Sequence, residues 1–312
     1  MKIETIISKR LLALLSAIIL ICLTSVKAEA GKKIPLADPF IYYENGVYYA
    51  YGTGSDYGIP MYTSSDLKTW HYDGLALNKN NTNIPRFFWA PEVYKVGQKY
   101  IMYFSGNEHL YVAEANSPKG PFKQVGNAPM LQEKAIDSSI FYSLSGKPYI
   151  VFVRMNDGNN VWVAPLREDM YNIDTTSMKH CFSVSQEWEK AQARVNEGPC
   201  VFTRHKKYYM IYSANDFRSP FYGLGMAESL LPEGPWTKWE DNPFLQKPDT
   251  LVGVGHNSFF KDAKGRMRIV FHAHASAHRV QPRYMYIGTL KFYRRGGKEH
   301  VKVVDIIQPT TE

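Results

Sequence analysis

The sequence predicts an all-β protein, a five-bladed β-propeller with a funnel-shaped site at one end of its central axis. Helical periodicity is scarce, and short apolar runs alternate with turn residues instead. One pattern also recurs five times: a polar head, a short apolar strand, a turn and a second apolar strand. A period of about 40–60 residues with about four strands per unit is typical of propeller blades. A β-sandwich with chance similarity is the alternative, and five copies in order argue against it.

The five units begin at the segments "ADPF", "APEV", "AIDSSIF", "NEGPCVF" and "GHNSFF". Their turns are of the Asn-Gly, Val-Gly, Ser-Gly, Lys-Lys and Lys-Gly type, which suits tight hairpins. The third and fourth strands of a unit are expected in "MYTSSDLKTW", "VAEANSPKGPF" and "MAESLLPEGPW", with looser copies in "VWVAPLREDM" and "MYIGTLKF". The acidic or histidine head residues lie 54, 45, 60 and 59 positions apart, and they are Asp38, Glu92, Asp137, Glu197 and His256.

The N-terminus has the features of a secretory signal peptide at residues 1–30. Basic residues precede an apolar stretch, Leu11–Val26, and small residues end it at Ala28-Glu29-Ala30. That stretch is too short to span a bilayer. Cys22 follows Ile-Leu-Ile, which does not suit a lipoprotein cleavage site. We expect an exported protein, periplasmic or extracellular, with residues 31–312 forming one catalytic domain.

The composition limits the kinds of molecule that the protein is expected to bind. The 312 residues are 45% hydrophobic and 14% aromatic, which excludes disorder. The net charge of +8 is spread along the chain, so nucleic acid is not an expected partner. The chain has no second long apolar run, so no membrane span is predicted. Outside the signal only Cys181 and Cys200 remain, and they either form one disulfide or stay buried thiols.

Propeller geometry brings the head residues together. The first strand of each blade lines the central axis, so equivalent positions on these strands form a ring. The sequence therefore predicts four acids and a histidine at one end of the axis. Like charges raise one another's pKa and are costly unless used, so the ring is a candidate site.

Three readings of this ring compete. Glycoside hydrolysis needs one carboxylic acid and an opposing carboxylate, and a third carboxylate would raise the pKa of the acid. A divalent-cation site and a structural polar channel are the alternatives. The segment "RFFWAPE" favours hydrolysis, because Phe87, Phe88 and Trp89 precede Glu92 and sugar rings pack on aromatic faces.

The ordered motifs "ADPF", "WAPE", "AIDSSIF", "NEGP" and "GHNSFF" resemble glycoside hydrolase family 43 over essentially everything after residue 30. Members of that family are five-bladed propellers that invert the anomeric centre in one displacement. By this resemblance Asp38 looks like the general base that activates water, and Glu197 like the general acid. Asp137 looks like the carboxylate that orients the acid and tunes its pKa.

The resemblance also implies a binding set. Arg283 in "QPRYMYIGTL" matches a late arginine that contacts the cleaved sugar, and Glu92 stands where many relatives carry Asp. Trp89 and Phe40 complete the expected substrate-binding residues. His256 matches a histidine that in many members helps hold a calcium ion or a water cluster on the axis. No cofactor is expected for the chemistry itself.

One histidine cluster lies outside these motifs. "FHAHASAH" holds His272, His274 and His278, and two alternating histidines share one face of a strand, as a zinc site would require. No carboxylate or cysteine completes the set nearby, so a structural role is favoured. "GTGS" at Gly52 does not precede a helix, which argues against a nucleotide loop.

The expected activity is that of an exo-acting α-L-arabinofuranosidase on arabinose- or xylose-containing oligo- or polysaccharide. β-Xylosidase, endo-arabinanase or another xylan-active enzyme of the same family, and a non-catalytic sugar-binding propeller, are the alternatives. Loop walls at Asn78–Arg86 and Phe217–Tyr222 are expected to decide between exo and endo action. The sequence leaves the oligomeric state open.

Overall fold

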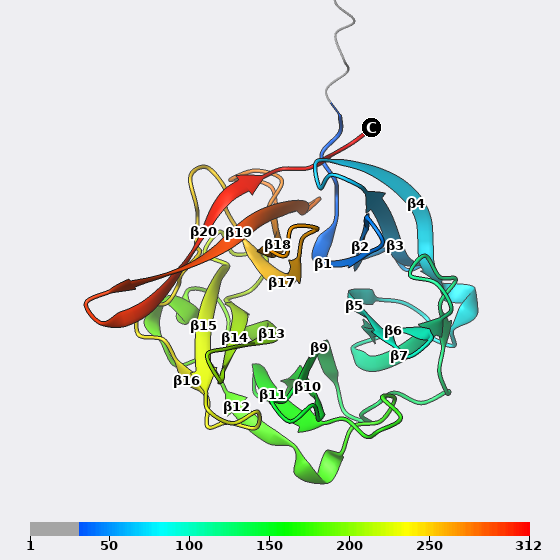
Figure 1. The fold of residues 1–312 in the computed structure, drawn as a ribbon, viewed down its shortest axis with the longest axis horizontal. Coiled ribbons are helices and arrows are strands. Elements are labelled where there is room, and N and C mark those ends of the chain that lie inside the picture. Colours follow the sequence, from blue (N-terminus) through cyan, green and yellow to red (C-terminus); the bar gives the residue numbers. More distant parts are fainter. Residues whose placement is uncertain (1–30) are drawn as a thin grey trace, which may run out of the picture. The chain divides into compact units, whose positions relative to one another are not determined.

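A computed structural model describes residues 31–312 of the chain, and the predicted signal peptide and Cys22 lie outside the described residues. Five sheets, four with four strands and one with five, surround a central axis, which confirms the predicted five-bladed propeller (Figure 1). Lys33–Glu312 forms one compact unit. No helix of the described residues is long and apolar enough to cross a membrane.

The blades follow one another along the chain, and in each the first strand is innermost (Figure 1). Blade 1 contains β1 (Ala37–Glu44), β2 (Val47–Thr53), β3 (Gly58–Ser64) and β4 (Thr69–Asn78). Blade 2 contains β5 (Phe88–Val96), β6 (Lys99–Gly106), β7 (His109–Ala115) and β8 (Lys123–Gln124). Blade 3 contains β9 (Ala135–Tyr142), β10 (Pro148–Met155), β11 (Asn159–Pro165) and β12 (Lys179–Phe182).

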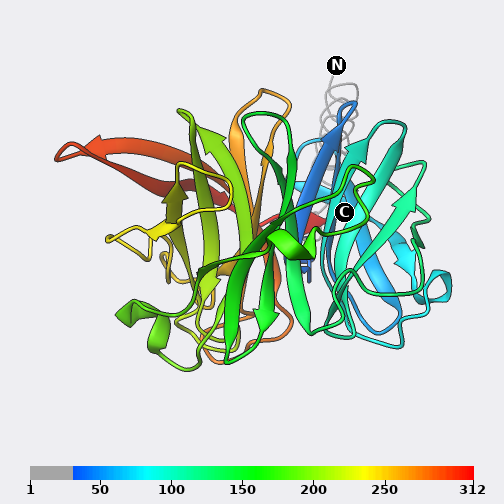
Figure 2. The ribbon, with the colours of Figure 1, turned by 90° about the horizontal axis from the view of Figure 1, so that it is seen from below.

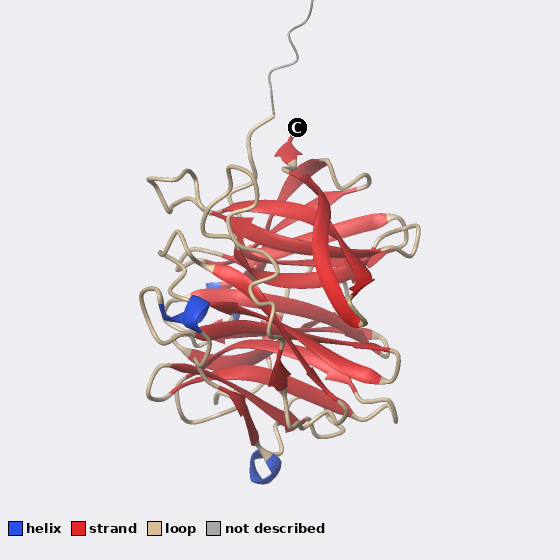
Figure 3. Cartoon of the chain, turned by 90° about the vertical axis from the view of Figure 1, so that its left-hand side faces the viewer, coloured by secondary structure: helices blue, strands red, loops and turns tan. Residues whose placement is uncertain are grey.

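The last two blades repeat this order. Blade 4 contains β13 (Asn196–Arg204), β14 (Lys207–Ala214), β15 (Gly223–Ser229) and β16 (Thr237–Lys238). Blade 5 contains β17 (Gly255–Lys261), β18 (Met267–Ala273), β19 (Tyr284–Arg295) and β20 (Lys298–Ile307). The helical content of the described residues is three short 3₁₀ segments, visible in Figure 3: η1 (Lys79–Asn81), η2 (Thr175–Ser177) and η3 (Glu187–Lys190).

Both ends of the described chain close the ring between blades 5 and 1. Strand β21 (Thr310–Thr311) pairs in parallel with β4, so the C-terminal segment extends blade 1. Before β1, the carbonyl of Ile34 accepts a hydrogen bond from the N–H of Met285 in blade 5. The Ile34 side chain is fully buried in the core between these two blades.

The hydrophobic core is divided among the five interfaces between neighbouring blades. One cluster joins blades 1 and 2, and further clusters join each following pair around to blades 5 and 1. The side view in Figure 2 shows the sheets standing side by side around the axis. Apolar burial therefore holds each blade to its two neighbours. Buried polar side chains, among them Asp38 and Asp137, lie near the axis.

The hairpin turns match the prediction in blade 1 and differ from it in the other blades. In blade 2 the turn is Gly97-Gln98 rather than Val-Gly, and blades 3 and 5 have longer loops at 143–147 and 262–266. Asn45 and Gly46 both have positive φ (51° and 84°), as a type I′ turn requires. In blade 4 the turn is His205-Lys206, with φ of 49° and 61°, and not the predicted Lys-Lys pair. Lys207 already pairs with Arg204, so the strand begins one residue earlier than the sequence suggested.

Cys181 and Cys200 are free thiols in the structure. Cys200 is buried, and its Sγ accepts a hydrogen bond of 3.1 Å from Nδ2 of Asn257. Of the two outcomes that the sequence left open, the structure has the pair of thiols.

The blade 4 turn gives a stability prediction. Lys206→Gly should raise the free energy of unfolding by roughly 0.5 kcal/mol, because relief of about 1–2 kcal/mol of left-handed strain exceeds the entropic cost of glycine. Gly146→Ala is the matched opposite: Gly146 has φ of 85° with open space around it, so only backbone strain is added. Chemical denaturation measures both variants. A destabilised Lys206→Gly would contradict the strain argument.

Candidate active site

Every innermost strand carries a bulge at the same place. Pairing with the second strand is interrupted by two residues, and the first of these has left-handed φ between 43° and 58° in all five blades. Non-glycine residues rarely adopt this conformation, and it concentrates at functional sites. The five bulge residues are Asp38, Ala90, Asp137, Gly198 and His256.

The bulge corrects the predicted ring. Asp38, Asp137 and His256 are equivalent, as expected, but Glu197 lies one position before the bulge residue of its blade and Glu92 two positions after. A bulge adds a residue, so counting from the head of each motif shifts the side chain that faces the axis. The shared Pro after Asp38, Ala90 and Gly198 was the signal that could have given the register.

Each bulge N–H is bound by a side chain of the preceding blade. The N–H groups of Ala90, Asp137 and His256 donate to hydroxyls of Thr53, Ser105 and Ser213, at 3.1, 3.0 and 2.8 Å. The N–H of Asp38 donates to Nδ1 of His272 at 3.1 Å, and that of Gly198 to Oδ2 of Asp137 at 3.1 Å. These bonds satisfy the donors that the bulges free and link the blades around the axis.

On one side of this ring lies an open pocket of about 390 Å³. Every blade contributes to its wall, and it brings together six residues of the predicted site: Asp38, Trp89, Asp137, Glu197, His256 and Arg283. Residues that the sequence did not single out also line it: Thr53, Ile136, Asn159, Val195, Asp216 and Gln281, together with Phe217. Phe217 belongs to one of the two loops expected to shape the site.

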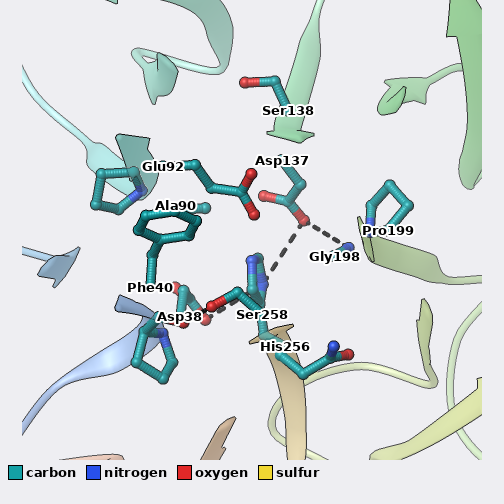
Figure 4. Close-up of a pocket in the computed structure, with 13 residues that line it drawn as sticks. Asp38, Phe40, Ala90, Glu92, Asp137, Ser138, Gly198, Pro199, His256 and Ser258 are labelled. Carbon is teal, nitrogen blue, oxygen red and sulfur yellow. Dashed lines mark hydrogen bonds and ion pairs between the residues drawn. The ribbon is translucent and has the colours of Figure 1, made fainter. Parts of the chain in front are cut away.

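The other predicted residues lie behind the ring. Glu92 and Phe40 border a small axial cavity (Figure 4). Asp38, Asp137 and His256 line both this cavity and the open pocket, so they stand between the two. Phe40 packs against Tyr94, with ring centroids 5.6 Å apart, as part of the core between blades 1 and 2. The structure therefore does not bring Glu92 or Phe40 to the pocket, and their expected sugar contacts have no support from its lining.

Asp38 is held as a carboxylate. Nη1 of Arg283 donates to its Oδ1 at 2.8 Å, Thr53 donates to its Oδ2, and Nδ1 of His256 lies 3.4 Å from its Oδ1. Burial favours the neutral form, but Arg283, His256 and His272 outweigh it and hold the pKa of Asp38 well below its usual range. Arg283, expected to contact the sugar, is thus first an ion-pair partner of Asp38.

The pKa values of Glu197 and Asp137 are raised, in contrast to that of Asp38. Burial raises the pKa of Glu197 to about 7, and the charge of Asp137 adds to the shift. Burial and the charge of Asp38 raise the pKa of Asp137 to about 7 as well. Glu197 accepts hydrogen bonds from Tyr222 at 2.8 Å and Asn159 at 3.1 Å. One pocket therefore holds an ionised carboxylate and two carboxyls that carry protons at mildly acidic pH.

The three histidines of "FHAHASAH" have different surroundings. His272 binds Asp38, and Nε2 of His274 lies 2.7 Å from the carbonyl oxygen of Phe217, while His278 is exposed. Within residues 31–312 no three His, Cys, Asp or Glu side chains are grouped to hold a metal ion. Two of the three histidines support the pocket instead.

A propeller pocket with one ionised and two protonated carboxyls has the chemistry of a glycoside hydrolase. The comparisons establish the family: residues 33–293 match the model of the glycosyl hydrolases family 43, and the chain belongs to that family. It is a glycoside hydrolase, and inversion is characteristic of the family. The reading as a non-catalytic propeller is therefore set aside.

Three similar proteins illustrate the family. A solved structure described as an endo-1,4-beta-xylanase from Bacteroides thetaiotaomicron is 38% identical, with a TM-score of 0.86, covering 91% of this chain and 99% of that one. An extracellular exo-alpha-(1->5)-L-arabinofuranosidase of Streptomyces chartreusis is 25% identical over 76% of this chain and 79% of its own length. An extracellular endo-alpha-(1->5)-L-arabinanase of Bacillus subtilis is 23% identical over 77% of this chain and 65% of its own length.

The charge arrangement can be tested by titration. In carboxyl ¹³C NMR, Glu197 and Asp137 should titrate as a coupled pair around pH 7, and Asp38 should stay ionised below its usual range. Asp137→Asn removes a negative charge beside Glu197, so the pKa of Glu197 should fall. Asp157→Asn, at an exposed acid of the same blade, is the control. An unchanged Glu197 titration in Asp137→Asn would refute the assigned cause.

Proposed function

We propose that Glu197 is the general acid and Asp38 the general base of a single-displacement hydrolysis. Glu197, protonated below about pH 7, donates its proton to the glycosidic oxygen that leaves. Asp38, ionised throughout that range, accepts a proton from the water that attacks the anomeric carbon. When Asp137 is ionised, its charge opposes loss of the proton from Glu197 and so raises the pKa of Glu197, and the Oδ2 of Asp137 is fixed by the N–H of Gly198.

For the substrate we infer a terminal arabinofuranose, released by exo action. The observation that carries this is the pocket: residues of all five blades line it, and its floor is the ring of Asp38, Asp137 and His256. A site walled by every blade suits the end of a chain better than its middle. The similar Streptomyces protein is described as an exo-acting arabinofuranosidase.

Two aromatic side chains offer the sugar contacts. Trp89 of blade 2 and Phe217, in the loop after β14, both line the pocket. Trp89 is backed by Phe87, with ring centroids 4.9 Å apart, and Arg86 lies over Phe87 at 4.5 Å. The loop at Asn78–Arg86 thus acts on the pocket only through this stack, whereas Phe217 shapes the pocket directly.

A xylan-active enzyme is the second candidate. The solved structure described as an endo-1,4-beta-xylanase shares 38% of residues with this chain and covers nearly all of it. Xylose and arabinose are both pentoses, so the same pocket volume serves either sugar.

The axial cavity is small, with a volume of about 10 Å³, roughly that of one water molecule. Ser138 Oγ and Asn257 Oδ1 are buried there without a hydrogen-bond partner among the described residues. Nδ1 of His256 is already engaged, 3.4 and 3.8 Å from Asp38 and Asp137. The resemblance implies a calcium ion or a water cluster near His256. We propose that a water molecule fills the cavity and that hydrolysis needs no cofactor. Heat of calcium binding by calorimetry would contradict this.

Export remains part of the proposal. Residues 1–30 have the signal-peptide pattern, and two similar proteins are described as extracellular. N-terminal sequencing of the exported protein should begin near Gly31, and an intact Met1 would reject cleavage.

The roles of the carboxyls predict distinct kinetics. Glu197→Gln should lower kcat/KM by about 10²–10⁴-fold on glycosides with poor leaving groups and much less on activated aryl glycosides, because these need little protonation. It should also remove the fall in kcat/KM above about pH 7. Asp38→Asn should lower turnover of both substrate types. Equal losses on the two leaving groups in Glu197→Gln would reject it as the acid.

The substrate is tested by the first products. The wild type should release free arabinose from aryl α-L-arabinofuranoside and from arabino-oligosaccharides, without accumulating shorter oligomers. Release of xylose from aryl β-D-xyloside with no arabinose would favour the second candidate. Early oligosaccharide ladders from arabinan would reject exo action.

A further inference from the structure

Two fully buried aromatic side chains contact the catalytic carboxyls without lining the pocket: Tyr222 and His272. We propose that they are positioning residues, which hold Glu197 and Asp38 in a fixed geometry as one unit. This inference rests on the proposed roles of those two carboxyls. It gives His272, which belongs to the "FHAHASAH" segment, a role in orienting Asp38 instead of the zinc-binding role that the sequence left as an alternative.

Tyr222 fixes the acid. It directly precedes β15, and its hydroxyl donates to Oε1 of Glu197 at 2.8 Å. The second oxygen, Oε2, accepts from Nδ2 of Asn159 at 3.1 Å. With a donor on each oxygen, the plane of the Glu197 carboxyl is set by blades 3 and 4 rather than by its own rotamer.

His272 fixes the base. It stands on β18 at the position that Thr53, Ser105 and Ser213 hold on the second strands of blades 1, 2 and 4. Nδ1 of His272 lies 3.1 Å from the N–H nitrogen of Asp38, and its Nε2 lies 3.3 Å from Nη1 of Arg283. Burial lowers the pKa of His272 to about 3, so the ring is neutral. It therefore orients Asp38 as a neutral ring rather than as a second cation beside Arg283.

The two rings are packed on one another. Their centroids lie 5.7 Å apart at an interplanar angle of 13°. Gly255, which pairs with His272 across β17 and β18, meets the same tyrosine: a Cβ there would come within 2.1 Å of the Tyr222 ring. The space for Tyr222 thus exists only because residue 255 is glycine.

The pH dependence has a definite sign. The charged and titratable groups that act on Glu197 are Asp137 of β9, His256 of β17, Asp38 of β1 and Tyr222 itself. The bond from Tyr222 stabilises the carboxylate and lowers the pKa of Glu197. Its removal should therefore move the alkaline limb of kcat/KM to higher pH.

Tyr222→Phe is the direct test, and Tyr103→Phe is its matched control. Tyr103 is also fully buried and donates its hydroxyl at 2.7 Å, but to the carbonyl oxygen of Met170, away from the pocket. We expect Tyr222→Phe to lower kcat about tenfold with KM nearly unchanged and the alkaline limb raised. Tyr103→Phe should keep the wild-type pH profile.

Coupling is tested by a cycle with His272→Asn. If both rings act as one unit, the double variant should lose much less than the product of the two single losses in kcat. If the loss in kcat of the double variant equals the product of the two single losses, the two rings do not act as one unit. Should Tyr222→Phe behave like Tyr103→Phe while Glu197→Gln is inactive, the inference fails and the proposed function stands. Should Glu197→Gln keep wild-type turnover, the proposed function itself fails.

Discussion

The site depends on one backbone constraint, the left-handed bulge repeated on all five innermost strands. It turns one residue per blade out of the β-ladder and frees its N–H, which a side chain of the preceding blade then accepts. Left-handed conformation at a non-glycine residue costs of order 1–3 kcal/mol. Four of the five bulge residues are not glycine and bear that cost. The hydrogen bonds between blades offset it, and they hold three of these residues, Asp38, Asp137 and His256, around the axis.

The exception explains the acid. In blade 3 the position that bears the accepting side chain elsewhere is Val153, which cannot accept a hydrogen bond. The carboxylate of Asp137 takes over and binds the N–H of Gly198. Gly198 in turn leaves room for the His256 ring, since a Cβ there would come within 3.1 Å of it. The acid of blade 4 is therefore carried by the preceding residue, Glu197, whose side chain lines the open pocket.

The repeat predicted the fold, because hairpin turns and apolar alternation are local signals that survive in every blade. It also predicted that Asp38, Asp137 and Glu197 meet, although up to 159 positions separate them. The repeat placed Glu92 and Phe40 at the pocket, where the structure does not bring them. A two-residue bulge changes which side chains face the pocket, and the hydrophobic pattern of the sequence does not reveal it. Tyr222 and Asn159 carry no motif at all, since their contacts to Glu197 depend on packing between blades.

The separation of the reacting carboxyls over different blades has a consequence for how such enzymes diversify. The proposed acid, Glu197, and the proposed base, Asp38, stand on β13 and β1, so the packing of whole sheets rather than a surface loop sets the distance between them. Loop residues such as Phe217 can be exchanged while that distance stays constant. Substitutions in such loops can therefore change the sugar preference while the arrangement of the carboxyls stays the same, which is consistent with one scaffold serving proteins described as arabinofuranosidase, arabinanase and xylanase.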